Sequence, residues 1–258
     1  MSKLFDVLVA TINQKDSSLI DIMNLKQSDV IITNQSNHFN IIKNSNYIMI
    51  TTDTKGVGVN RNIGILLSKK EYILITDDDM VFNDDFEKLI EEHIKNNLDL
   101  DIIIYNFDYY KDNRFIKKRF NTTQKVHLYN CLRHGICCTL IKKNIINKHQ
   151  LYFTTLFGGG SKYGSGEDSL FFLECVKKGF NILQSDINLG RNVYRPSTWF
   201  KGYTEKFFFD KGAWLSCAFP KMKYIMTLYF AIRFKNKSDF SLFKIIKLLI
   251  MGIKDFEK

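Results

Sequence analysis

The alternation of strand-like and helix-like segments in the first half of the chain constrains its fold more than any other feature. Five short runs of β-branched and other apolar residues occur at 5–11, 29–33, 47–51, 72–76 and 100–105. Apolar residues at helical spacing lie between them, at 17–25, 60–67 and 84–94. Strands that alternate with helices form a sheet covered by helices on its faces. The sequence therefore predicts an α/β fold with a Rossmann-like, mostly parallel sheet.

The second half of the chain lacks this regular alternation. Its recognisable segments are a polar stretch, a strand-like run, a glycine-rich loop and an amphipathic helix, at 111–125, 136–141, 158–166 and 167–178 respectively. Gly179 is suited to end that helix, because glycine readily adopts the left-handed conformation that follows many helices. Irregular polar and glycine-rich segments of this kind often bind substrates.

The C-terminal part of the sequence differs in composition from the rest. From residue 221 onward it is aromatic, aliphatic and basic, which predicts two closing helices outside the sheet. A chain of 258 residues is long enough for one α/β domain and such an extension. We therefore assign residues 1–215 to one domain and residues 216–258 to basic amphipathic helices.

The charge of the chain narrows the class of its partners. A formal net charge of +10 and a pI near 9.2 favour an anionic partner, which can be a nucleic acid, a phosphorylated substrate or an acidic lipid surface. No apolar stretch reaches the roughly 20 residues that a membrane-spanning helix requires, so we expect any membrane contact to be peripheral. The five cysteines form no disulfide framework and the N-terminus has no cleavage site, which favours the cytoplasm.

Three adjacent carboxylates follow the fourth strand-like run. Asp77, Asp78 and Asp79 repel one another unless a positive group lies beside them. In an open α/β sheet, ligands bind at the carboxyl ends of strands, and hard oxygen ligands there suit Mg²⁺ or Mn²⁺ that also holds a diphosphate. The alternative interpretation is a solvated acidic turn that caps the helix expected from residue 84.

A glycine-containing helix start lies upstream, at residues 55–64. Its glycines, two asparagines and Arg61 suit an anionic or polar ligand. Arg61 stands where a dinucleotide fingerprint has its third glycine, and the chain contains no Gly-Lys dipeptide, so nicotinamide and P-loop chemistry are disfavoured. Alternatively, the glycines only relieve crowding where the helix begins.

A second pair of carboxylates, Glu167 and Asp168, begins the helix that follows the glycine-rich loop. A base that removes a proton from a hydroxyl needs a carboxylate in a cleft, and flexible glycines would let the loop close over it. Helix N-termini also stabilise carboxylates, so capping alone would explain the pair.

The order of these motifs resembles the family 2 glycosyltransferases of bacteria, over approximately residues 4–215. The matching segments are 10–13, 60–64, the acidic triplet and 166–168. The resemblance implies a GT-A fold, with a nucleotide-sugar-binding half at 1–106 and an acceptor half at 107–215. It also implies a nucleotide-sugar donor, a saccharide acceptor and a Mn²⁺ or Mg²⁺ cofactor. A weaker match at 195–203 resembles a subgroup associated with capsule and lipopolysaccharide assembly.

The resemblance also assigns roles on the donor side. Asp77 and Asp79 correspond to the ends of the family's D-x-D motif, so that Asp79 reaches the metal and Asp77 lies near both the metal and the donor ribose. The other expected donor contacts are Asp78, Arg61, Thr11 and Asn13 near the nucleoside, and Asn34, which stands where many relatives place an acidic residue that binds the nucleobase. A UDP-sugar is the donor that we expect.

On the acceptor side, the resemblance makes Asp168 the catalytic base and places Glu167 nearer the acceptor. We expect a single displacement that inverts the anomeric centre and adds one sugar per binding event. The lysines and arginine that interleave with apolar residues after 221 suit an anionic membrane surface and an acceptor on a lipid carrier. Packing on the catalytic domain or across a dimer is the alternative for these helices.

Two rival functions share parts of this pattern. A basic module that binds nucleic acid would use the aromatic and lysine residues at 109–120, but the acidic triplet would repel a phosphate backbone, so we expect no nucleic-acid partner. A sugar-1-phosphate nucleotidyltransferase would need a glycine- and arginine-rich loop after the first strand, and the residues from Thr11 onward do not supply one.

Overall fold

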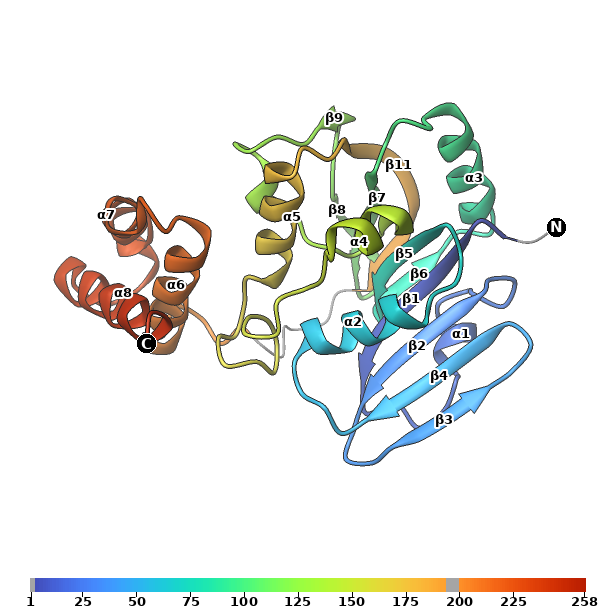
Figure 1. The fold of residues 1–258 in the computed structure, drawn as a ribbon, viewed down its shortest axis with the longest axis horizontal. Helices are drawn as coiled ribbons and strands as arrows, with labels where there is room; N and C mark the ends of the chain where they lie inside the picture. The colour runs from blue at the N-terminus through green and yellow to red at the C-terminus, as the bar shows by residue number, and fades with distance from the viewer. Residues whose placement is uncertain (1–2, 194–199) are drawn as a thin grey trace.

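The computed structural model describes residues 3–193 and 200–258 and shows a central sheet covered by helices, with a separate group of helices at the C-terminal end (Figure 1). Within these residues the sheet has eleven strands, in the order β3-β4-β2-β1-β5-β10-β7-β11-β6, with β8 paired to β7 and β9 to β11. The strands are β1 (Phe5–Ile12), β2 (Val30–Gln35), β3 (Asn40–Lys43), β4 (Tyr47–Thr52), β5 (Tyr72–Asp77), β6 (Met80–Phe82), β7 (Ile102–Lys111), β8 (Arg114–Lys118), β9 (Gln124–Lys125), β10 (Thr139–Lys142) and β11 (Ile182–Val193).

The helices cover both faces of the sheet and form the C-terminal group. They are α1 (Leu19–Ile22), α2 (Val57–Leu67), α3 (Phe86–Asn96), the 3₁₀ turn η1 (Cys131–Arg133), α4 (Lys143–His149), α5 (Glu167–Lys177), α6 (Glu205–Ala218), α7 (Lys223–Phe234), the 3₁₀ turn η2 (Lys235–Lys237) and α8 (Leu242–Phe256). In β1, Leu8 packs into the core on the face with α2 and α5, whereas Val7 and Val9 belong to the core on the opposite face with α3. A strand buried on both faces reads as a continuous apolar run, which is why β1 is easily recognised.

Four neighbouring strands of the N-terminal half are parallel, as expected, whereas β3 pairs antiparallel with β4. β4, β2, β1 and β5 run in the same direction, so that Thr11 lies opposite Asn34 and Ala10 opposite Asp77. Beyond β5 the sheet is mixed, because β10 is inserted antiparallel between β5 and β7. The carboxyl ends of β1, β2 and β5 therefore meet at one edge.

Several elements were not anticipated. β8 forms a hairpin with β7 and lies in the stretch expected to be a polar loop. All its residues are exposed, so it has no buried apolar face that would mark it as a strand in the sequence. Asp112 and Asn113, with φ of 50° and 60°, make the two-residue turn that such hairpins favour. The first helix is shorter than the expected 17–25, because α1 spans only Leu19–Ile22. The long strand β11 and the helix α6 are not expected from the sequence. The helix after Gly166 and its end at Gly179, with φ of 80°, are confirmed.

The two helices expected after residue 221 are present as α7 and α8, and α6 joins them (Figure 1). The boundary expected after residue 215 falls inside α6 (Glu205–Ala218), which packs along α8. Most of the 195–203 segment lies outside the described residues. Among the described helices, none is both long and apolar enough to cross a membrane.

Two glycines allow α6 and α8 to touch through their backbones. A Cβ at Gly252 would stand 1.8 Å from the Phe209 carbonyl oxygen, and one at Gly212 would stand 2.0 Å from the Leu249 carbonyl oxygen. Both distances are shorter than the contacts that Cβ atoms make in real proteins. The contact between the helices therefore requires glycine at both positions.

We expect Gly252→Ala to lower the free energy of unfolding by about 1–3 kcal/mol, the usual range for an overpacked core. The clash is with backbone, which cannot turn aside, so it should outweigh the gain of about 1 kcal/mol in helix propensity. Urea unfolding measures the change, and Met251→Ala, at a neighbouring position that is 46% exposed, is the control. A Gly252→Ala protein as stable as the parent would show that the helices separate freely.

Candidate functional site

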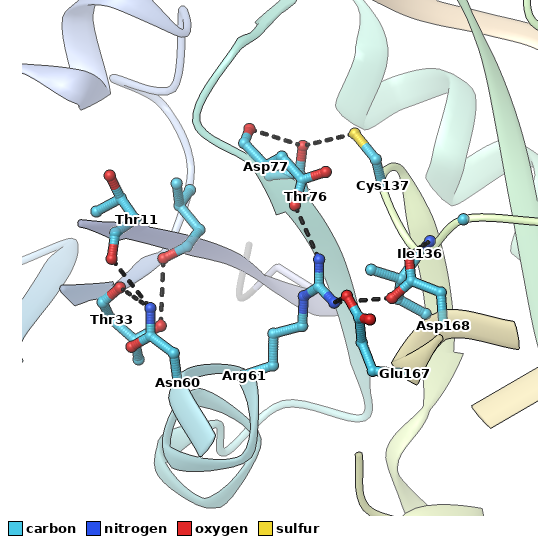
Figure 2. Close-up of polar contacts among 12 residues, drawn as sticks. Thr11, Thr33, Asn60, Arg61, Thr76, Asp77, Ile136, Cys137, Glu167 and Asp168 are labelled. Atoms are coloured by element: carbon cyan, nitrogen blue, oxygen red, sulfur yellow. Dashed lines mark hydrogen bonds and ion pairs between the residues drawn. The ribbon is translucent and has the colours of Figure 1, made fainter. Parts of the chain in front are cut away.

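The centre of the site is one buried arginine that contacts three carboxylates (Figure 2). Arg61 Nη1 donates to Asp168 Oδ1 at 2.8 Å and lies 3.5 Å from Glu167 Oε1, and Arg61 Nη2 donates to Asp77 Oδ1 at 3.1 Å. The Arg61 side chain is only 5% exposed. It brings together the acidic residue at the end of β5 and both carboxylates at the start of α5.

The charges of this cluster determine its protonation. Burial by itself lowers the pKa of Arg61, but the three carboxylates more than reverse this effect and hold the guanidinium charged. Burial raises the pKa of Asp168 and of Glu167, and Arg61 opposes the rise at both. Because one cation faces three carboxylates, the cluster keeps an excess of negative charge at the edge of the sheet.

The acidic triplet occupies the turn between β5 and β6. Asp77 ends β5, and its side chain is 42% exposed. Asp78 Oδ2 accepts a hydrogen bond from Thr11 Oγ1, which joins the triplet to the end of β1. The backbone oxygen of Asp79 accepts from Val193 at 2.8 Å, so the turn is also tied to β11. The triplet is therefore held between the two halves of the sheet.

The expected nucleotide side is built from the ends of β1 and β2. Asn60 Nδ2 donates to the carbonyl oxygens of Thr11 and Thr33, at 3.0 and 2.9 Å, and so fixes both strand ends (Figure 2). Asn13 follows β1 with a positive φ of 55° and an exposed side chain. Asn34 is fully buried. Its side-chain oxygen accepts a hydrogen bond from the backbone N–H of Gln14, and its Nδ2 donates to the backbone oxygen of Gln14. Asn34 therefore positions the loop after β1 and does not face an open site.

The two carboxylates of α5 are held in place by the C-terminal helices. Gly166, with φ of 121°, has no room for a Cβ, which would stand 2.3 Å from Trp214 Cδ1 of α6. Trp214 Nε1 donates to Ser169 Oγ at 3.0 Å, one residue beyond Asp168. Glu167 Oε2 accepts from the backbone of Gly166 at 3.0 Å. The loop expected to be free to close is thus packed against α6.

The glycines at the start of α2 serve packing. A Cβ at Gly58 would stand 2.2 Å from the Thr154 carbonyl oxygen, and one at Gly64 would stand 2.0 Å from Leu8 Cδ1. The amide of Val57 donates to the Gly159 carbonyl oxygen at 2.9 Å. The structure therefore favours the alternative that these glycines relieve crowding, and Arg61 is the residue of this motif that contacts other site residues.

The carboxylates open onto a cavity of about 470 Å³. Asp77, Asp79 and Asp168 line it, together with Ile136, whose backbone N–H donates to Asp168 Oδ2 at 3.1 Å. The remaining lining residues are Phe107, Tyr109, Lys117, Arg119, Phe120, Arg133, Gly135, Cys137 and Asn192. Two residues expected in the site, Asp77 and Asp168, thus face the same space although 91 positions separate them in the sequence.

The basic and aromatic residues of this cavity are not among the site residues expected from the sequence. Arg119 lies between Phe107 and Phe120, with its guanidinium carbon 4.8 and 4.7 Å from their ring centroids. Lys117 Nζ lies 5.2 Å from the ring centroid of Tyr109. The available signal was the mixture of lysines and aromatic residues at 109–120, which the sequence analysis connected only with nucleic acid.

The residues present fit a divalent cation only in part. Asp77 and Asp79 both line the cavity and offer the hard oxygen ligands that Mn²⁺ and Mg²⁺ prefer. Within the described part of the chain, no three His, Cys, Asp or Glu side chains are placed to hold one ion together. A cation here would therefore need further oxygen ligands from a diphosphate and water.

Comparisons with known proteins concern both the sequence and the fold. A family model described as "Glycosyl transferase family 2" matches residues 28–161, just over half of the chain. Among curated proteins, no sequence matches this chain with significance.

Similar solved structures include three crystal structures of S. aureus TarS 1–349. The one in complex with UDP-GlcNAc has a TM-score of 0.59 and 16% identity, covering 98% of this chain and 72% of that one. The one whose description names no ligand has a TM-score of 0.56 and 15% identity, covering 98% and 71%. The one in complex with UDP has a TM-score of 0.56 and 16% identity, covering 100% and 72%. At such identities the likeness concerns the fold.

We expect Asp168→Asn to stabilise the fold at pH 8, by about 1 kcal/mol, the usual order for one favourable substitution. The folded-state pKa of Asp168 is raised above its unfolded value, which is near ~3.9, so ionisation of Asp168 destabilises the folded protein. That penalty is absent below the unfolded pKa, grows as pH rises through the window between the two values, and is complete above the folded pKa. Urea unfolding of both proteins at pH 4 and pH 8 measures it. A variant that is less stable than the parent at pH 8 would contradict the assignment.

Proposed function

This chain belongs to glycosyl transferase family 2, and from that premise we propose that it transfers one sugar from a UDP-sugar to a saccharide acceptor of a bacterial surface polysaccharide. The expected α/β fold, similar to GT-A glycosyltransferases and followed by C-terminal helices, is confirmed. Membership of this family supports glycosyl transfer over the two rival functions, nucleic-acid binding and nucleotidyl transfer. One observation carries the residue-level proposal: Arg61 joins Asp77, where the donor phosphates are expected, to Asp168, where the base is expected.

The proposed donor site is the edge formed by the ends of β1, β2 and β5. Thr11 and Asn13 lie at the end of β1, beside the turn that carries Asp78. Solved structures with a similar fold contain UDP-GlcNAc or UDP, which supports a uridine nucleotide as the donor of this chain. Asn34 is already bonded to the Gln14 backbone, so its proposed contribution is to shape this loop.

Asp168 is the proposed catalytic base. It lines the cavity, its side chain is 27% exposed, and each carboxylate oxygen accepts one hydrogen bond from the protein. A carboxylate has about four lone-pair sites, so capacity remains for the proton of an acceptor hydroxyl. Burial raises the pKa of Asp168, which makes the carboxylate a stronger base, while Arg61 opposes this rise and favours the ionised form. Attack by the acceptor hydroxyl on the face of the donor sugar opposite the leaving diphosphate would invert the anomeric centre.

Asp77 and Asp79 are the proposed ligands of Mn²⁺ or Mg²⁺, with the donor diphosphate completing the coordination. When bound, the cation would neutralise charge that develops on the leaving diphosphate. Arg61 cannot take over this role at full strength, because its guanidinium already contacts three carboxylates. Glu167 shares Arg61 with Asp168 and is proposed to position the base from the acceptor side.

We expect UDP and a matching UDP-sugar to raise the melting temperature in the presence of Mn²⁺, because a ligand at 100 times its Kd stabilises the folded state by about 2.7 kcal/mol. Asp79→Asn should lose this shift. Asp168→Asn should keep the shift and lose turnover roughly 10²–10⁴-fold, the usual contribution of a general base. Asp85→Asn, an exposed carboxylate outside the cavity, is the control and should behave as the parent.

The outcomes separate the parts of the proposal. A shift that needs no cation and survives Asp79→Asn would remove the metal site. Normal turnover in Asp168→Asn would remove the base. Retained anomeric configuration, read by NMR of the product, would contradict the single displacement.

The outward face of α7 supports a peripheral contact with an anionic membrane, which would place the enzyme at the cytoplasmic face of the plasma membrane. Tyr224, Ile225, Leu228, Tyr229 and Ile232 are each at least 50% exposed, which is unusual for one side of one helix. Residues 221–238 contain five lysines and arginines and no acidic residue. An anionic lipid surface satisfies both the apolar and the basic side chains. Symmetric self-association of this face would bring like charges together instead. An acceptor on a lipid carrier would be delivered at the same surface.

We expect the protein to sediment with phosphatidylglycerol vesicles at low salt and to be released by added salt. Replacing Ile225 and Ile232 by serine should weaken this binding by roughly tenfold or more, since two exposed apolar side chains are lost. The matched control replaces Phe39 and Ile41, which are 68% and 50% exposed on the sheet domain. Equal loss in both variants, or no sedimentation of the parent, would remove the membrane contact.

A further inference from the structure

Three basic side chains, which we call the basic wall, line the same cavity as the carboxylates. Lys117 and Arg119 come from β8 and the residue after it, and Arg133 comes from η1. In the described residues none of the three forms an ion pair with a carboxylate, whereas Arg61 satisfies Asp77 and Asp168. Cations that face a cavity without a carboxylate partner provide a positive field for an anionic ligand.

The positions of these cations are determined by the protein. Arg119 donates to the carbonyl oxygens of Tyr105, Cys137 and Gly135, at 3.1, 2.5 and 2.6 Å, and these neutral acceptors fix its position without removing its charge. That charge also acts on Asp168, because Arg119 lowers the pKa of this carboxyl. Arg133 Nη2 lies 3.4 Å from Gln184 Oε1. The wall is therefore already arranged around the space that it faces.

The donor diphosphate does not account for this wall. The diphosphate is expected at the end of β5, whereas the cations are carried by the β7–β8 hairpin and by the segment that leads into β10. β10 lies between β5 and β7 in the sheet, so the two groups are carried by strands that are not neighbours.

The composition of the wall also indicates the kind of molecule that carries the anion. Phe107, Tyr109 and Phe120 line the cavity beside the cations. Aromatic side chains provide an apolar surface against which a sugar ring can pack, with its polar groups directed elsewhere. A wall with both aromatic rings and cations suits a sugar that bears a negative charge better than a free inorganic ion.

We propose that the cavity binds a second anionic group besides the donor diphosphate, a phosphate or carboxylate carried by one of the two sugars, and that Lys117, Arg133 and the fixed charge of Arg119 recognise it. This inference rests on the proposed glycosyl transfer and adds the substrate class. The anion can belong to the acceptor sugar or to the donor sugar, because both lie in the cavity at the moment of transfer.

The test uses the full chain and a double variant, Lys117→Gln with Arg133→Gln. Both residues are exposed, so the fold should tolerate the change. Lys118→Gln is the matched control, because Lys118 follows Lys117 in β8, points to the other face of the strand and does not line the cavity. Arg119 is left in place, since it holds three backbone carbonyl oxygens.

For an anion on the acceptor, the probes are glucose 6-phosphate, glucuronic acid and neutral glucose, titrated by calorimetry or ligand-observed NMR with and without saturating UDP and Mn²⁺. At least one charged probe should bind the parent roughly tenfold more tightly than glucose, as expected for charge-assisted contacts. The double variant should lose that preference, and Lys118→Gln should retain it. If the anion belongs to the donor, the parent should bind UDP-glucuronic acid more tightly than UDP-glucose, and the double variant should lose this preference.

Other results would overturn the inference. One is a parent protein that binds no charged probe better than its neutral counterpart in either comparison. Another is a double variant with the preference intact, or one that loses affinity for UDP itself, which would assign these cations to the leaving diphosphate. Binding of UDP to the parent is measured in the same samples, so failure of the donor site is recognised separately from failure of the anion site.

Discussion

The ion cluster around Arg61 is the interaction on which the rest of the site depends. One guanidinium, buried with 5% of its side chain exposed, joins α2, β5 and α5. An isolated buried charge is very unfavourable, so loss of Arg61 would leave three carboxylates without their cation, whereas loss of one carboxylate leaves Arg61 paired with the other two. The three carboxylates therefore hold Arg61 in place, and Arg61 in turn holds Asp168 at the cavity. One side chain, Arg61, therefore fixes the geometry of both the proposed donor side and the proposed base.

The C-terminal helices contribute to the same geometry from outside the sheet. Trp214 packs against Gly166 and binds Ser169, and Asp255 of α8 accepts a hydrogen bond from the Tyr163 hydroxyl at 2.9 Å. Asp210 of α6 accepts from the amide of Gly164 at 2.9 Å. The loop that leads to Glu167 and Asp168 is thus fastened to α6 and α8. A membrane contact through α7 would place this whole assembly, with its base, at the lipid surface.

Basic side chains of this chain surround two separate surfaces. The lysines around α7 surround an exposed apolar helix face, whereas Lys117, Arg119 and Arg133 line the cavity that contains Asp77, Asp79 and Asp168. Each arrangement matches a different anion, a lipid headgroup in the first case and a charged sugar in the second. The net charge of +10 alone gave no means to divide its lysines and arginines between the two.

The sequence by itself determined the strands whose two buried faces make continuous apolar runs, such as β1 and β5, and the carboxylates that follow them. It also identified Arg61, Asp77 and Asp168 one by one, because charged residues beside glycines and strand ends stand out locally. Only the tertiary structure decided that these three touch, since Arg61 and Asp168 are 107 positions apart and meet through the order of the strands. The lysines and aromatic residues at 109–120 were a local signal, but only the fold shows that Lys117 and Arg119 line the same cavity as Asp77 and Asp168. The Trp214 contact with Gly166 left no local pattern, because the two residues are far apart in the sequence.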